Sequence, residues 1–110
     1  MKVLIELKDE DSLNTYELDT DKKWRLDFDD QGTSCKIRVY DDGLTIERRN
    51  EEYEIYLNLR NECTCLIKNE IGEVKIDSKV LAYNKNSDIV YMLYLVDEQE
   101  KEIKIEYIGV

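Results

Sequence analysis

Three cysteines are the first residues whose type and spacing could support chemistry. Cys63 and Cys65 are two residues apart, so in a strand both thiols would lie on one face, as in half of a thiolate metal site. A structural zinc site needs four ligands, and the chain has only Cys35 besides these two and no histidine. We therefore expect reduced thiols that pack like small hydrophobic side chains, with no metal and no cofactor.

Arg48 is a second candidate, for binding an anion. It is in phase with Leu44 and Ile46, so the two-residue period of a strand points it toward the core. Because a buried unpaired charge is strongly destabilising, Arg48 must be paired or lie at an open rim. In that case its planar donor fork suits a carboxylate. The alternative is that the strand ends at Glu47 and the guanidinium is solvated.

Several aromatic side chains fall on the same predicted inward stripes. Tyrosine hydroxyls among apolar walls are typical of small-molecule sites, although core packing with the hydroxyls at the rim explains them as well. The candidate ligand-binding residues are Trp24, Arg48, Tyr53, Tyr91 and Tyr107.

Composition excludes several classes of function. The 110 residues contain 16 Lys plus Arg against 26 Asp plus Glu, a formal net charge of −10, which argues against nucleic-acid or anionic-membrane partners. Without histidine there is no Ser-His-Asp triad, and no nucleophile–base pair can be drawn, so we expect that the chain is not an enzyme. No apolar run reaches the ~18 residues of a membrane span.

Residue usage and the N-terminus predict the location of the chain. The first residues carry no signal-peptide pattern, because Glu6 interrupts a short apolar run. The preference for Lys, Asn and Ile and the absence of proline are typical of an AT-rich bacterial genome. We therefore expect a cytoplasmic bacterial protein with one domain, residues 1–110.

Alternation of apolar and polar residues predicts the elements that position these side chains. Runs such as Val3–Leu7, Trp24–Phe28 and Tyr53–Leu59 have the period of strands, and short turn-forming clusters separate them. Among these, Asp42–Gly43 suits a type I′ turn. We expect an all-β antiparallel meander of about 8–10 strands, closed into a small barrel because closure removes exposed edges. A two-sheet sandwich satisfies the same pattern.

The run from Ile89 to Val96 is apolar on both faces. We expect Ile89, Tyr91, Leu93 and Leu95 to face the core, so the opposite face needs its own cover. Either another segment of the chain or a second copy supplies it, since exposed apolar patches usually mark a contact. The candidate homodimer contact consists of Val90, Met92, Tyr94 and Val96.

The order of the later segments resembles the YwiB-like family, an uncharacterised bacterial family of calycin-type β-barrels. The resemblance extends from about residue 21 to residue 108 and rests on strand order and on Ile71–Ile76, in which Gly72 opens a strand. It implies a lipocalin-like barrel without an assigned activity, and it transfers no catalytic residues.

These observations leave two functions open. The leading hypothesis is a non-enzymatic barrel that binds a small apolar or carboxylate-bearing molecule in its lumen. The alternative is an interaction or structural protein with a packed barrel, which acts through its acidic surface or through the 89–96 strand.

Overall fold

The computed structural model describes residues 1–109 and is all-β, which confirms the predicted fold class. None of these residues forms a helix that is long and apolar enough to cross a membrane. The ten strands are β1 (Lys2–Lys8), β2 (Leu13–Asp19), β3 (Arg25–Asp30), β4 (Thr33–Tyr40), β5 (Gly43–Arg49), β6 (Tyr53–Leu59), β7 (Thr64–Asn69), β8 (Glu73–Lys85), β9 (Ile89–Val96) and β10 (Gln99–Ile108).

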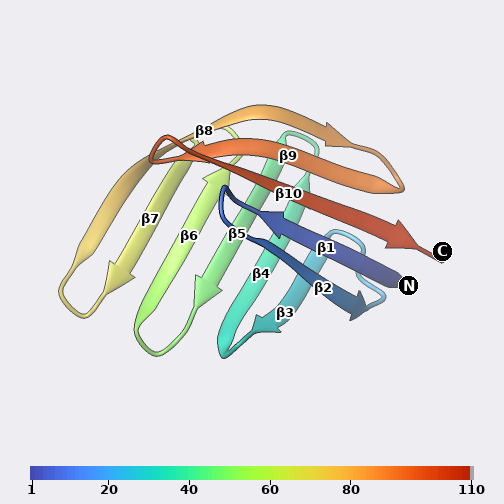
Figure 1. Cartoon of the computed structure of the whole chain (residues 1–110), viewed down its shortest axis with the longest axis horizontal. Helices are drawn as coiled ribbons and strands as arrows, with labels where there is room; N and C mark the ends of the chain where they lie inside the picture. The colour runs from blue at the N-terminus through green and yellow to red at the C-terminus, as the bar shows by residue number, and fades with distance from the viewer. Residues whose placement is uncertain (110) are drawn as a thin grey trace.

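The strands form one antiparallel sheet that curls into a nearly closed barrel (Figure 1). Each strand from β3 to β9 pairs with the next one in sequence, and β1 pairs with both β2 and β10. The first and last strands are therefore neighbours, with Lys2 opposite Ile108. Most of the closure that alternation predicted is achieved through this β1–β10 pairing.

Strand β8 joins the two halves of the barrel. Its first part, from Glu73 to Asp77, pairs with β7, and its second part, from Ser78 to Lys85, pairs with β9. The register shifts between Val80 and Ala82, and a bulge of this kind bends a strand. Figure 1 shows β8 arching over one side of the barrel, with β3–β7 in one layer and β9, β10, β1 and β2 crossing in the other.

The core lies between these layers and consists of the inward residues of every second position. Side chains without exposed surface come from both layers and include Ile5, Leu26, Ile37, Leu44, Leu59 and Ile103. Burial of apolar surface stabilises a fold by about 25 cal/mol per Å². Packing of the two layers against each other therefore stabilises the curled form of the sheet.

The turns differ from the expectation in one place. The two residues between β4 and β5 are Asp41 and Asp42, and Gly43 already pairs with Tyr40 as the first residue of β5. The predicted type I′ turn at Asp42–Gly43 is therefore wrong. Positive φ at both central residues, which a type I′ turn requires, occurs at Gln31 (52°) and Gly32 (90°) and again at Asp97 (50°) and Glu98 (63°).

The predicted phase of β9 is also wrong. Val90, Met92 and Tyr94 lie in the core, with exposures of 0, 0 and 5%, whereas Tyr91 and Leu93 are on the outer face and half-buried. The neighbouring strand explains this choice, because directly opposite residues share a face and Met92 pairs with Ile103. Three of the four proposed dimer-contact residues are thus core residues that a second copy cannot reach.

A seam remains between β2 and β3, which do not pair with each other in the described part of the chain. Tyr16 and Phe28 cover it from inside, with ring centroids 4.7 Å apart. The Thr20 amide donates to the Met1 carbonyl, and the Val39 amide donates to the Trp24 carbonyl. Strand β2 is therefore hydrogen-bonded only to β1, and β3 only to β4. In both strands the amide and carbonyl groups of every second residue point into the seam.

Candidate functional site

A cavity of about 290 Å³ lies between the two layers near one end of the barrel. Apolar side chains from β5, β6 and β7 form one wall, namely Ile46, Ile55, Leu57 and Ile67. The opposite wall includes Leu7 of β1 and Tyr94 of β9. Its volume is just below the range of small-molecule sites, about 300–1,000 Å³, so only a small molecule fits.

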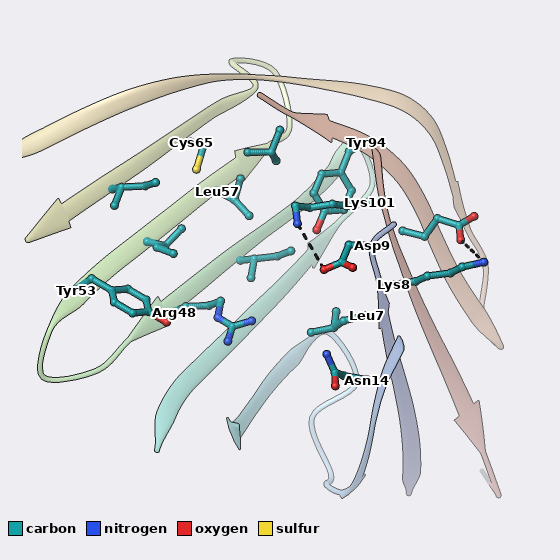
Figure 2. A pocket seen from close by; sticks show the side chains of 15 residues that line it. Leu7, Lys8, Asp9, Asn14, Arg48, Tyr53, Leu57, Cys65, Tyr94 and Lys101 are labelled. Atoms are coloured by element: carbon teal, nitrogen blue, oxygen red, sulfur yellow. Dashed lines mark ion pairs between the residues drawn. The ribbon is translucent and has the colours of Figure 1, made fainter. Parts of the chain in front are cut away.

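The alternation of β5 and β6 positions the first wall. In the ladder Ile46 is opposite Leu57 and Arg48 is opposite Ile55, so these four side chains share the inner face. Tyr53 continues the β6 stripe to the rim. Figure 2 shows Arg48 and Tyr53 pointing into the cavity from these two strands.

Arg48 is inward and paired, which decides between the two alternatives that the sequence left open. Its Nη2 donates to Oδ2 of Asp30 at 3.1 Å, with 29% of the arginine side chain and 18% of the aspartate side chain exposed. Burial and a hydrogen bond to Asp30 raise the pKa of Tyr16 to about 12. The carboxylate of Asp30 therefore neutralises Arg48 from β3, and Tyr16 of β2 lies close enough across the seam for its pKa to respond to the same carboxylate.

Lys101 is a second inward cation, and it enters from the other layer. It lines the cavity from β10, and its Nζ lies 4.0 Å from Oδ2 of Asp9 in the β1–β2 turn (Figure 2). The other oxygen of Asp9 accepts hydrogen bonds from the amides of Asp11 (2.9 Å) and Ser12 (2.8 Å) and from the Ser12 hydroxyl (3.0 Å). These bonds lower the pKa of Asp9 and keep its carboxylate charged within the turn.

Sequence reasoning missed Lys101, although the signal was present. The stripe of Ile103, Ile105 and Tyr107 reaches Lys101 when it is extended by two residues. The turn before this strand consists of Asp97 and Glu98 alone, and β10 begins at Gln99, so Lys101 is already inside the strand.

Of the five candidate ligand residues, Arg48 and Tyr53 line this cavity and three others do not. Trp24 and Tyr107 lie in an edge-to-face pair, with ring centroids 5.4 Å apart, and they fill another part of the barrel. The Nζ atoms of Lys23 and Lys85 lie 4.9 and 4.3 Å from the Trp24 ring, a favourable cation–π arrangement. Tyr91 is on the outer face, where its hydroxyl donates to Glu102.

Tyr94 lines the cavity, although the sequence placed it in a dimer contact. Its side chain is 5% exposed, and burial raises its pKa to about 12. The phenol is therefore protonated at neutral pH and can donate a hydrogen bond. Among the hydrogen bonds of the described residues, none involves this hydroxyl.

Comparison with known proteins leaves the family open. No family model matches the sequence, and no curated protein matches it. The crystal structure of YwiB protein from Bacillus subtilis is similar over 99% of this chain and 89% of that chain, with 12% sequence identity and a TM-score of 0.35. Similarity at this level establishes neither a family nor an activity.

Proposed function

We propose that this chain is a non-catalytic binding protein whose lumen holds a small, mostly apolar molecule that carries a carboxylate. The cavity of about 290 Å³, with its apolar wall and inward cations, is the observation that supports this function. Small-molecule sites commonly combine apolar walls with a few polar groups that fix orientation. The absence of a nucleophile–base pair in the sequence favours storage or transport over catalysis.

The setting that we propose is the bacterial cytoplasm, without nucleic-acid or membrane partners. The net charge of −10 supports the second part, since both partners attract cationic surfaces. Three free cysteines, two of them buried, are compatible with a reducing compartment. We further propose that the chain is a member of the YwiB-like family with a calycin-like barrel, which the sequence resemblance supports.

Blocking the cavity tests this function directly. We choose octanoate and octanol as probes and isothermal titration calorimetry as the measurement. Ile55→Trp places an indole inside the cavity and should weaken binding of both probes by at least about tenfold. Tyr56→Trp is the matched control, because Tyr56 is next in sequence, 42% exposed and on the outer face.

The expected result is binding of octanoate to the wild type and to Tyr56→Trp, but not to Ile55→Trp. The function is rejected if the wild type binds neither probe at millimolar concentration. It is also rejected if Ile55→Trp binds the probes as well as the wild type does, because the ligand would then lie elsewhere.

The outer face of β9 favours an interaction protein as the second candidate. Ile89, Tyr91, Leu93 and Leu95 are half-buried there, and Leu81 of the adjacent β8 is 44% exposed. Acidic and basic side chains of β10 lie opposite this stripe, with Glu102 opposite Leu93 and Lys104 opposite Tyr91. A partner that covers an apolar stripe with a charged margin would fit this face.

A further inference from the structure

The two cations that enter the cavity are neutralised to different degrees. Arg48 donates to Asp30 at 3.1 Å, which is within the range of an N–H···O hydrogen bond. Its partner belongs to β3, two strands away, so the pair links elements of one layer. The charge of Arg48 is therefore largely neutralised by Asp30 within the protein.

Lys101 has a weaker partner. Its Nζ is 4.0 Å from Asp9, too far for a hydrogen bond, and the other oxygen of Asp9 is held by the turn. Only 30% of the lysine side chain is exposed, so water replaces the missing hydrogen bonds only in part. An ammonium group has three donors, and those of Lys101 remain open to a ligand.

Tyr94 lies beside this ammonium. Tyr94 and Lys101 are direct partners in the β9–β10 ladder, and direct partners have Cβ atoms about 4.5–5.5 Å apart on the same face. Figure 2 shows both side chains reaching into the same part of the cavity. Two donors with different chemistry, an ammonium and a phenol, thus point toward one space.

We propose that Lys101 and Tyr94 form the head-group site of the cavity and that its occupant is a small organic monocarboxylate. This inference rests on the proposed function and assigns the part of the site that recognises charge. The ammonium binds one carboxylate oxygen, the Tyr94 hydroxyl donates to the same group, and Arg48 contributes at longer range.

The apolar wall then fixes the direction of the ligand. The head group lies against β9 and β10, and the hydrocarbon part extends toward Ile55 and Leu57 of β6, which line the other side. A neutral molecule of the same length would fill the same wall but leave the ammonium without a partner. The site should therefore prefer the acid over the alcohol.

Calorimetry with octanoate and octanol on charge variants tests the assignment. Lys101→Met keeps the length of the side chain and removes its charge, and we expect octanoate to bind at least about tenfold more weakly while octanol is unaffected. Tyr94→Phe should weaken octanoate several-fold and leave octanol unchanged. Lys104→Met is the matched control, since Lys104 lies on the same strand but on the outer face, opposite Tyr91.

The outcomes separate this inference from the proposed function. The head-group assignment is overturned if the wild type binds octanoate and Lys101→Met binds it equally well, or if the wild type prefers octanol; lumen binding survives in both cases. If the wild type binds neither molecule, the proposed function fails and this inference fails with it. Equal losses of octanoate in Lys101→Met and Lys104→Met would show a general charge effect and would also overturn it.

Discussion

Gly43 is the residue at which the main chains of two strands come closest. Its φ is 152°, and a Cβ built on it would lie 2.1 Å from the carbonyl oxygen of Leu59 in β6. Any side chain must therefore push β6 away from β5 at the start of their ladder. The requirement for glycine comes from this contact and not from a turn.

We predict that Gly43→Ala lowers the free energy of unfolding by at least about 2 kcal/mol more than Gly72→Ala. Gly72 is the matched control because its φ is 158° and a Cβ there would meet no atom within 4 Å. Urea denaturation of both variants measures the difference. Equal losses of unfolding free energy in the two variants would mean that backbone strain, and not the contact with Leu59, is the reason for glycine at position 43.

Some site residues could be predicted from the sequence because alternation reports the face of a strand. Arg48 was placed inward by its phase with Leu44 and Ile46, and it does line the cavity. Alternation does not tell how far along the barrel axis a side chain lies, however. For this reason the sequence predicts one site for Tyr53 and Tyr107, although only Tyr53 lines the cavity. That distance depends on strand stagger, which a single sequence does not encode locally.

The inward face of strand β9 could not be predicted from alternation, because both of its faces are apolar. Both phases satisfy the hydrophobic pattern, so the decision comes from the partner strand, in which Ile103 and Ile105 alternate with charged residues. Pairing with Ile103 turns Met92 inward. Strand β8 adds a second difficulty, because its bulge between Val80 and Ala82 shifts the phase along one strand.

We predict opposite results for neighbouring charges on β9. Met92→Glu puts a carboxylate at a fully buried position and should prevent folding or cost at least about 4 kcal/mol. Leu93→Glu, on the half-buried outer face, should cost less than about 1.5 kcal/mol. Circular dichroism during urea denaturation gives both values.

Sedimentation of Leu93→Glu addresses the alternative function at the same time. If the wild type is a dimer and this variant a monomer, the outer face of β9 is an interface. A Met92→Glu variant that loses no more unfolding free energy than Leu93→Glu would contradict the inward phase of the strand.

The barrel as a whole is held closed by hydrogen bonds everywhere except at the β2–β3 seam. The residues whose main-chain groups face the seam carry outward side chains, among them Glu17 and Asp19 on β2 and Asp27 and Asp29 on β3. Charged side chains discourage edge strands from pairing with other molecules. Two of these carboxylates are paired with cations of the neighbouring strands, Glu17 with Lys2 and Asp27 with Arg38. The seam is therefore open, but both of its edges carry charged side chains.

Amide hydrogen exchange rates along β2 and β3 should alternate between fast and slow from one residue to the next. We predict that Thr15, Glu17, Asp27 and Asp29 exchange on the order of a hundredfold faster than Tyr16, Leu18, Leu26 and Phe28, because only the second group bonds to β1 or β4. NMR-detected exchange at neutral pH provides the rates. Uniform protection along both strands would instead indicate pairing across the seam.

The seam was not predictable because the sequence gives turns and faces but not the pairing of distant strands. Short connections correctly suggested a meander, and the link from Asp19 to Arg25 is short as well. Its residues nevertheless cross the end of the barrel, where Trp24 packs against Tyr107. The end of the link is bonded to other strands, since the Trp24 carbonyl accepts a hydrogen bond from the Val39 amide of β4 and the Trp24 ring packs on Tyr107 of β10.

The position of this gap has a consequence for the connectivity of the chain. Lys2 is opposite Ile108, so a short linker could join those strands, while new ends could be opened in the link between β2 and β3. Such a circular permutant would start at β3 and finish at β2, and its order along the chain would equal the order across the sheet. Every hydrogen-bonded neighbour would then be consecutive. The long-range β1–β10 closure, the slowest kind of pairing to form, would become a local hairpin, and the contact order would fall without loss of a single ladder.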